Sequence, residues 1–523
     1  MPRRSKKPTQ QAVSNIGGII APVKGWTSQK SLAEAEDGTA LILDNIFPEA
    51  EAVRSRRGAT LQASGIGSSV DSVLAYPSKT SAGKLFAAKS TSIYDVSGIG
   101  AVGAAVVTGK TNGKWQSELF ANAADQFLVI CNGVDGVMTY DGTTWVDQTA
   151  SLTGFSALTF IQVCAHNSRL WFVPDNSTDL YYLPPSSING ALLKFGIGAQ
   201  MRLGGKIIAL STWSSAQGNA MEDRLVIITN QGEVFIYAGT DPSSATTWSL
   251  SIRFVLSPPM SNRCFFPIGA DLAILTEAGL IPLSQVIEID SAVLSDKAFS
   301  KRIRAAYNES VKAARNIFGW CITTLPNSNM AIVNVPAAGG SVVQQFVMNT
   351  VTGAWCRFFG WNANCWAYLA GAIYYGDPNG NVLRAEYGAN DNGSPIQLAL
   401  LTSFSALNFP GRLKMVNLVR PIISSDTDQT ASLAVAVDYI EPTLSPLTAS
   451  AVSGSWFVWG TSVWGSSDIW RDEMIILGWD GAGNCGTMIA IAFSLSIDAS
   501  AAGNEFDYRL IAFNIVFELG FVV

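Results

Sequence analysis

The chain has 523 residues, of which 48% are hydrophobic and only 14% carry a charge, and its formal net charge is −6. This balance lacks the basic excess of a protein that reads nucleic-acid sequence, and so few charges suggest a surface that is buried between subunits. The single histidine excludes mechanisms that need two, and the seven dispersed cysteines contain none of the C-x-x-C pairs of zinc sites.

The chain begins with a basic segment, since four of the first seven residues are Arg or Lys. We expect residues 1–20 to form a mobile basic arm that is solvated. The residues after the basic start are too polar for a signal peptide, and no apolar run approaches the ~18 residues of a membrane span. We therefore expect synthesis in a cytosol and no stable membrane insertion. Residues 21–65 contain short apolar runs cut by Pro and Gly, which predict strands that join a platform domain or close a propeller.

A repeating unit follows, in which a four-residue apolar strand, a polar turn and a second strand rich in aromatic and β-branched residues recur every 40 to 60 residues or so. One such hairpin cannot bury both of its faces, whereas hairpins stacked around a ring cover one another. Residues 66–394 are therefore predicted to form a β-propeller of six or seven blades, in an all-β protein. The seven predicted hairpins pair 85–88 with 93–96, 127–130 with 137–140, 170–173 with 180–183, 225–228 with 234–237, 272–275 with 280–283, 330–333 with 345–348, and 372–375 with 382–385.

One segment breaks the β pattern, because Phe299, Ile303, Ala306, Ser310 and Ala314 recur at helical spacing. We expect one inserted helix near 295–315, capped at its start by a serine. Its charge favours a solvated face, and a contact with DNA or with an acidic partner ring is the alternative. The candidate contact residues are Lys297, Lys301, Arg302, Arg304, Lys312 and Arg315.

The hairpin repeat stops near residue 394, and residues 395–523 alternate in the manner of strands, which predicts an antiparallel, β-sandwich-like platform domain. This region contains an unusual density of tryptophans. Packing in a core is one role for them, and a subunit interface is the other, because Trp is enriched in interface cores. The candidate interface residues are Trp456, Trp459, Trp464 and Trp470.

No motif in the chain carries catalytic, cofactor or metal chemistry. Residues 104–111 nearly match a phosphate-binding loop, but turn residues follow where a helix is needed. Asp377 opens a segment that departs from a calcium loop at its sixth position, and a hairpin turn is expected instead. His166 lies two residues from Cys164 without the geometry of a nucleophile and its base, so we expect a structural histidine. The sequence therefore predicts no enzyme, no catalytic residue, no cofactor and no metal site.

Several segments carry a resemblance to a known family. Residues 303–395, with Ala-Ala-Arg-Asn-Ile-Phe-Gly-Trp at 313–320 and Asn-Thr-Val-Thr-Gly-Ala-Trp at 349–355, resemble tail structural proteins of short-tailed bacteriophages. Residues 21–26, 44–48 and 54–58 resemble the start of the same proteins. The tail part that the chain most resembles is the tail nozzle, also called tail tubular protein B or tail hub.

That resemblance implies a virion protein, present in the tail as a hexameric ring below an adaptor ring, near fibres or spikes. Double-stranded DNA would pass through the ring without sequence-specific binding. Since every phosphate that a Lys or Arg neutralises adds affinity, we expect an acidic or uncharged lumen, with Lys301, Arg304 and Lys312 facing partner proteins. The alternatives are a propeller module that binds a host glycan or protein and, less favoured, a propeller glycosidase or lyase.

Overall fold

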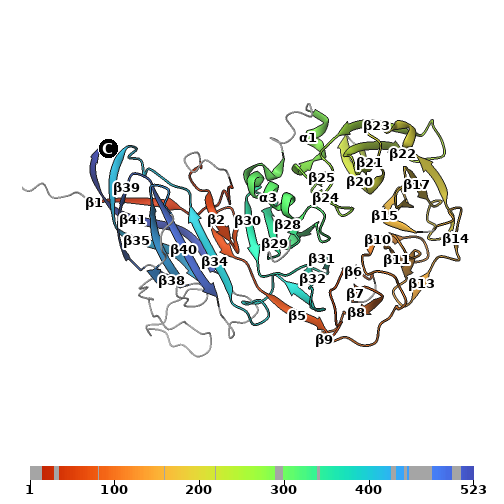
Figure 1. Ribbon diagram of the computed structural model, residues 1–523, viewed down its shortest axis with the longest axis horizontal. Coiled ribbons are helices and arrows are strands. Elements are labelled where there is room, and N and C mark those ends of the chain that lie inside the picture. Colours follow the sequence, from red (N-terminus) through yellow and green to blue (C-terminus); the bar gives the residue numbers. More distant parts are fainter. Residues whose placement is uncertain are drawn as a thin grey trace, which may run out of the picture. The chain divides into compact units, whose positions relative to one another are not determined.

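The computed structural model describes residues 14–28, 35–79, 82–157, 159–217, 220–288, 298–337, 342–425, 431–440, 445–446, 474–476, 478–497 and 508–522. The chain divides into two compact units (Figure 1). The first to be described consists of Gly58–Gly353 and Phe359–Tyr387. The other consists of Met1–Arg57, Ala354–Phe358 and Gly388–Val523.

The first unit contains seven successive antiparallel sheets, which we call blades one to seven, within the part of the chain that the structure describes. Blade one consists of β6 (Ser72–Tyr76), β7 (Lys84–Lys89) and β8 (Ser92–Asp95), and blade two of β10 (Gln116–Ala121), β11 (Gln126–Cys131), β12 (Met138–Tyr140) and β13 (Trp145–Asp147). Blade three consists of β15 (Phe160–His166), β16 (Arg169–Pro174), β17 (Asp179–Tyr182) and β19 (Leu193–Gly196). Blade four consists of β20 (Ile207–Gln217), β21 (Ala220–Thr229), β22 (Glu233–Gly239) and β23 (Trp248–Val255).

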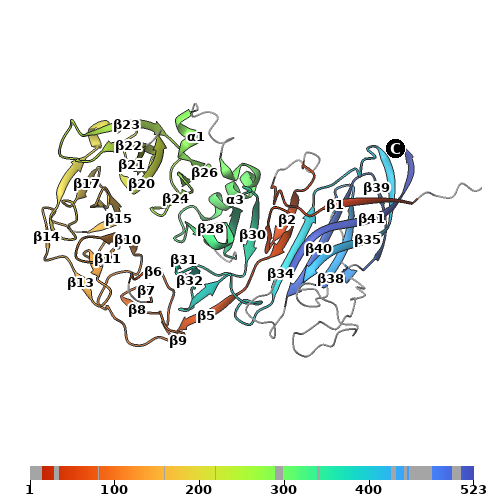
Figure 2. The same cartoon turned by 180° about the vertical axis from the view of Figure 1, so that it is seen from behind.

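Blades five to seven complete the ring (Figure 2). Blade five consists of β24 (Phe265–Ile268), β25 (Asp271–Thr276) and β26 (Gly279–Pro282), and blade six of β27 (Cys321–Leu325), β28 (Met330–Val335) and β29 (Gln344–Asn349). Blade seven consists of β31 (Cys365–Leu369), β32 (Ala372–Gly376), β33 (Val382–Ala385) and β5 (Ala59–Ser64). Shorter elements in this unit are β9 (Gly100–Ala101), β14 (Leu152–Thr153), β18 (Gly190–Ala191) and the 3-10 segments η2 (Gly198–Gln200) and η5 (Pro326–Ser328).

The first strand of each blade, the inner strand, contacts the first strand of the next blade. The contacts run from β6 through β10, β15, β20, β24 and β27 to β31, and from β31 back to β6. A closed ring of seven sheets follows, which is a seven-bladed β-propeller. All seven predicted hairpins are confirmed, and each forms two neighbouring strands of one blade.

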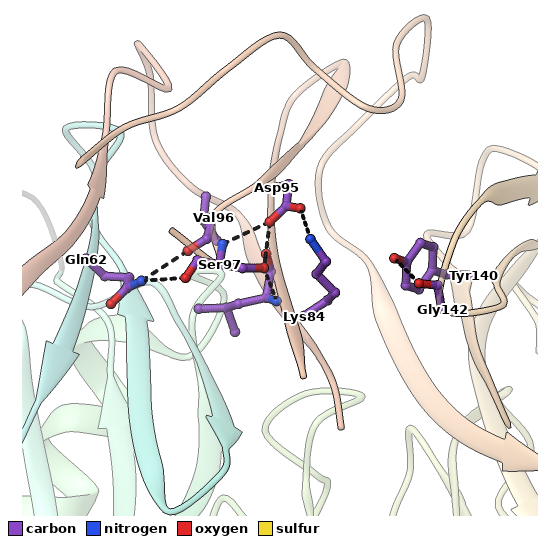
Figure 3. A network of polar contacts seen from close by, with 8 residues as sticks. Gln62, Lys84, Asp95, Val96, Ser97, Tyr140 and Gly142 are labelled. Atoms are coloured by element: carbon purple, nitrogen blue, oxygen red, sulfur yellow. Dashed lines mark hydrogen bonds and ion pairs between the residues drawn. The ribbon is translucent and has the colours of Figure 1, made fainter. Parts of the chain in front are cut away.

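The ring is closed by a strand from the start of the unit. β5 pairs antiparallel with β33, so that Ala63 faces Val382 and Ala59 faces Ala385. The Gln62 side chain of β5 donates hydrogen bonds to the carbonyl oxygens of Val96 and Ser97 at the end of blade one (Figure 3). β5 thus completes blade seven by main-chain pairing and joins it to blade one by side-chain hydrogen bonds. The edge strand β33 of blade seven is thereby paired.

The core of the propeller lies between the blades. Apolar side chains alternate along each strand, so that a blade presents one set to the blade before it and another to the blade after it. Between blades one and two, Phe86 packs edge-on against Tyr140 and Trp145. Between blades three and four, Trp248 stacks at 5.7 Å on both Trp171 and Tyr237.

The predicted inserted helix is confirmed between blades five and six. After the short α1 (Leu283–Glu288), the 3-10 segment η4 (Phe299–Ile303) leads directly into α3 (Arg304–Ala314). Ser310 and Ala314 are buried, as their spacing predicts, together with Tyr307, whose hydroxyl donates to the Thr276 carbonyl oxygen at 2.6 Å. The α-helix has no side-chain cap at its start, and the serine expected to cap the helix lies outside the described residues.

The second unit is a sandwich of two largely antiparallel sheets, and its residues from 395 onward form strands as predicted for the platform. The predicted mobile arm over residues 1–20 is wrong for Ser14–Ile20, which forms a strand because its backbone pairs antiparallel with residues 512–518. One sheet contains β1 (Ser14–Ile20), β3 (Ile46–Pro48), β4 (Val53–Ser55), β35 (Arg412–Ser425), β38 (Met474–Ile476), β39 (Asp480–Gly486) and β41 (Tyr508–Val522). The other contains β30 (Trp355–Phe359), β2 (Ala40–Asp44), β34 (Ile396–Thr402), β40 (Ile489–Ile497), β36 (Ala431–Val437) and β37 (Ser445–Pro446).

The two sheets pack face to face, because the ring of Phe493 on β40 lies 6.4 Å from the rings of Tyr508 and Phe513 on β41. A buried ion pair also joins distant segments of this unit. The Arg56 guanidinium is fully buried between Asp391, with which it forms a two-pronged ion pair, and the side-chain oxygen of Asn45. Such a pair fixes the relative position of its segments because neither charge can be left alone in the core.

Candidate functional site at the propeller axis

A cavity of about 240 Å³ lies on the propeller axis. Its lining comes from inner strands β6, β10, β15, β27 and β31 and from the segment that leads into β24. We call it the axial pocket. Its polar and aromatic lining residues are Trp115, Gln116, Ser117, Gln162, Asn262, Arg263, Phe265, Thr323 and Trp366.

The segment 257–264, between blades four and five, supplies two of these side chains and enters the middle of the ring. Asn262 donates from Nδ2 to the Ile161 carbonyl oxygen of β15 at 3.1 Å. Ser261 donates from Oγ to the carbonyl oxygen of Trp320, just before β27, at 2.9 Å. This segment therefore links blades that are not its sequence neighbours, and we call it the axial segment.

Arg263 is the charged residue of the axial pocket. Its Nη2 donates to the Ser72 hydroxyl at 3.0 Å and to the Trp115 carbonyl oxygen at 2.9 Å. The guanidinium also lies 5.3 Å from the centre of the Phe318 ring, a distance typical of cation–π contacts. Hydrogen bonds and an aromatic face thus hold the cation in one position.

Asp71 is the acid that interacts electrostatically with this cation. Burial raises the pKa of Asp71, while a hydrogen bond from the Ser90 backbone and the charges of Lys114 and Arg263 lower it. The Lys114 ammonium lies 4.7 Å from the centre of the Phe318 ring, so this ring contacts two cations, Lys114 and Arg263. Positive charge therefore collects beside the axial pocket.

Polar side chains of the inner strands bridge neighbouring blades. Gln162 on β15 donates to the Leu210 carbonyl oxygen on β20 at 3.0 Å and accepts from the Leu210 N–H at 2.6 Å. Glu118 on β10 accepts a hydrogen bond from the Ala165 backbone on β15. Burial raises the pKa of Glu118 to about 7, since removal from water disfavours the charged carboxylate and the Ala165 hydrogen bond offsets only part of that effect.

His166 is buried and hydrogen-bonded at both ring nitrogens. Nδ1 lies 3.1 Å from the Thr212 hydroxyl, and Nε2 lies 3.1 Å from the Asn167 side-chain amide. Burial lowers the pKa of His166 to about 4. The Cys164 thiol is also buried, which raises its pKa, and it contacts the Ala165 carbonyl oxygen rather than the imidazole. This arrangement is that of a packed structural histidine.

The motifs that resemble ligand-binding loops are occupied by their own hydrogen bonds. The Asp377 carboxylate accepts from the backbone of Asn379 and Asn381 and from the Asn381 amide, within the turn between β32 and β33. In the segment 104–111, the Lys110 ammonium pairs with Asp147 at 2.9 Å. Among the described residues, no group of three His, Cys, Asp or Glu side chains could hold a metal ion. No helix of the described residues is long and apolar enough to cross a membrane.

The predicted basic residues that the structure describes are not among the residues that line the pocket. Lys301, Arg304, Lys312 and Arg315 are exposed on η4, α3 and the turn after it, and Arg302 is half-buried. Arg315 forms an ion pair with Glu277. Lys297 and the four predicted interface residues Trp456, Trp459, Trp464 and Trp470 lie outside the described residues.

The sandwich unit presents a second candidate surface, on the outer face of the sheet that contains β1, β41 and β35. The register places Ile16, Val516 and Leu418 in one row across three strands, and Ile20, Ala512 and Ile422 in a second row. Ile16 is 77% exposed and Leu418 is 38% exposed. We call these six residues the outer sheet face.

Comparison with known proteins gives structural similarity alone. No known protein family and no curated protein match the sequence. The WD40 β-propeller domain of Doa1 is similar in structure, with 11% identity and a TM-score of 0.39 over 63% of this chain and 97% of that one. The Swd1 β-propeller domain of Myceliophteria thermophila has 8% identity and a TM-score of 0.37, over 63% and 99%. YCF48 from Cyanidioschyzon merolae has 12% identity and a TM-score of 0.36, over 61% and 95%.

The axial pocket was not predicted from the sequence. The hairpins that reveal the repeat are the second and third strands of each blade, whereas the pocket is lined by the first strands. Inner strands such as β10 and β27 are more polar and lack the apolar runs that mark a strand in a sequence. The Arg263 side chain, which lies in a connecting segment, gave no local signal at all.

Proposed function

We propose that this chain is a structural protein of a bacteriophage tail, whose copies assemble into a ring of the nozzle type. The proposal rests on the resemblance of residues 303–395 to such proteins, and it assigns the chain no catalytic role. In that role the ring, expected to be a hexamer, would conduct and retain double-stranded DNA before ejection. It would contact an adaptor ring and fibres or spikes.

The observation that carries the assembly is the outer sheet face. Folded monomers rarely leave rows of large apolar side chains in water, because about 25 cal/mol is lost for each Å² of apolar surface that stays exposed. Here two cross-strand rows of apolar residues, in which Ile16, Ile20 and Leu418 are exposed, cover three adjacent strands of the sandwich. A second copy of the chain is the partner that a ring would supply.

Mass photometry of the purified chain, together with the copy number in gradient-purified virions, tests this proposal. We expect one discrete ring, and about six copies per particle if the family's hexamer holds. Leu418→Lys is expected to dissociate the ring by placing a cation in an apolar row. Val351→Lys, at a 74% exposed position of the propeller, is the matched control and leaves assembly intact. A purely monomeric chain that is absent from virions would refute the proposal.

A second candidate function is favoured by the axial pocket. A β-propeller with a preformed polar cavity on its axis is suited to act as a binding module for a glycan or a protein of a host. Glycan-array binding by the purified chain would test this role. Binding that survives the blockage of the axial pocket by Ser117→Leu would place the glycan elsewhere.

A further inference from the structure

The charge balance of the axial pocket points to the kind of ligand that it accepts. Arg263 is the only charged side chain of the lining. A guanidinium has five N–H donors, and the two on Nη2 are used by Ser72 and Trp115. The other three N–H groups, on Nε and Nη1, have no hydrogen-bond acceptor among the described residues. No carboxylate of the described residues lies at ion-pair distance from the guanidinium.

We infer that the axial pocket binds a sugar carboxylate of monosaccharide size, of the uronate class. This inference deepens the second candidate function, the binding module, and is independent of ring assembly. Arg263 supplies the charge and the parallel N–H donors that carboxylates prefer. Its existing contacts keep the guanidinium fixed, so that little side-chain entropy is lost when a ligand binds.

The volume and the rest of the lining favour a sugar over a smaller anion. The cavity volume of about 240 Å³ is several times the share of about 30 Å³ that one water molecule takes in the liquid, so the pocket is larger than a small anion needs. Ser117 and Thr323 contribute hydroxyl groups whose side chains make no hydrogen bond among the described residues. Trp366 contributes an aromatic wall against which the apolar face of a sugar ring can pack.

The charges around the pocket discriminate against other ligands. Arg263 and Lys114 both interact with the Asp71 carboxyl, and the three charges leave a local excess of one positive charge, which matches a monoanion. A neutral sugar would leave the three Arg263 N–H donors unpaired. Inorganic phosphate would satisfy the charge without using Ser117, Thr323 or Trp366.

Isothermal titration calorimetry of the full chain with D-glucuronate, D-glucose and inorganic phosphate tests the inference. We expect glucuronate to bind with a Kd of about 1 mM or tighter, and glucose and phosphate to bind at least tenfold more weakly. Arg263→Met is expected to weaken glucuronate binding at least tenfold. Arg253→Met, which removes an arginine of the outer strand β23, is the matched control and leaves binding unchanged.

Arg263 also holds blades together, so a second variant separates folding from binding. Ser117→Leu breaks no side-chain hydrogen bond and fills the pocket, and it should abolish glucuronate binding in a protein with unchanged thermal unfolding. Equal binding of glucose and glucuronate, or glucuronate binding that Ser117→Leu leaves intact, would overturn the inference. A titration in which glucuronate produces no heat of binding would also overturn the inference. Glycan-array binding of neutral glycans alone would keep the binding module and reject the uronate.

Discussion

Two titratable side chains, the half-buried Glu118 and the buried His166, lie on the neighbouring inner strands β10 and β15. Burial shifts both toward their neutral forms, because a charge without a partner is poorly solvated inside the ring. The two shifts act on stability in opposite directions with pH. The propeller is therefore expected to be most stable in a slightly acidic range, between the pH regions in which each group would be charged.

For Glu118, the pKa is about 7 in the folded chain, against an ordinary value of 4.5. Between those values the folded chain binds the extra proton, so stability falls as pH rises from about 4.5 through 7. Glu118→Gln keeps an acceptor for the Ala165 N–H and removes the buried charge. We expect it to raise the free energy of unfolding by between about 1 and 3 kcal/mol at pH 8, and hardly at pH 4.5.

Urea unfolding at the two pH values measures this effect. Glu309→Gln, at an exposed position on α3, serves as the control and should change stability by the same small amount at both. A gain for Glu118→Gln that did not depend on pH would show that the carboxylate is not neutral in the fold.

For His166, the shift runs the other way, since its pKa is about 4 in the folded chain against 6.5 for the free group. The unfolded chain binds the proton first, so the contribution of this group is lost as pH falls from about 6.5 toward 4. The chain has one histidine, and a single imidazole resonance reports it by NMR. We expect that resonance to titrate near pH 4 in the native protein and near 6.5 in urea. A native midpoint near 6.5 would contradict the burial.

At the scale of elements, closure by β5 decides whether seven blades form one ring. Ala63 on β5 is 1% exposed and faces Val382 on β33. Ala63→Asp buries a carboxylate without a partner, and we expect it to cost about 3 kcal/mol or more and to broaden thermal unfolding. Ser64→Asp, at the half-buried next position of the same strand, should cost less than about 1 kcal/mol. Circular dichroism during heating compares the two, and equal losses would mean that β5 is not integral to blade seven.

The inserted helix is an element of another kind. Its buried face packs beside blade five through Tyr307 and Thr276, while Lys301, Arg304 and Lys312 are exposed. That division supports the solvated face expected from the sequence. A basic contact with a partner ring remains part of the tail proposal, because those three residues face away from the buried side.

At the scale of the whole molecule, the net charge of −6 bears on how DNA would pass. Affinity for duplex DNA comes mainly from counterions that basic groups release. We expect the chain, free or assembled, to bind a short labelled duplex more weakly than about 1 µM at physiological salt, as measured by fluorescence anisotropy. Nanomolar binding that weakens steeply with salt would contradict an acidic or uncharged lumen.

The sequence by itself determined the blades. Alternation of apolar residues and the glycine or asparagine turns act over a few residues, so the hairpin of 127–130 with 137–140 could be placed before any fold was known. The amphipathic spacing of Ile303, Ser310 and Ala314 located the helix for the same reason. Strand alternation likewise predicted the sandwich.

Only the tertiary structure decided what lies at the centre of the propeller. Arg263 contacts Ser72 across 191 residues of sequence, and β5 completes a blade whose other strands begin at Cys365. Contacts of this range depend on how the ring closes, which local propensity does not specify. The axial pocket is a product of that closure, since each lining strand contributes only one to three of its residues.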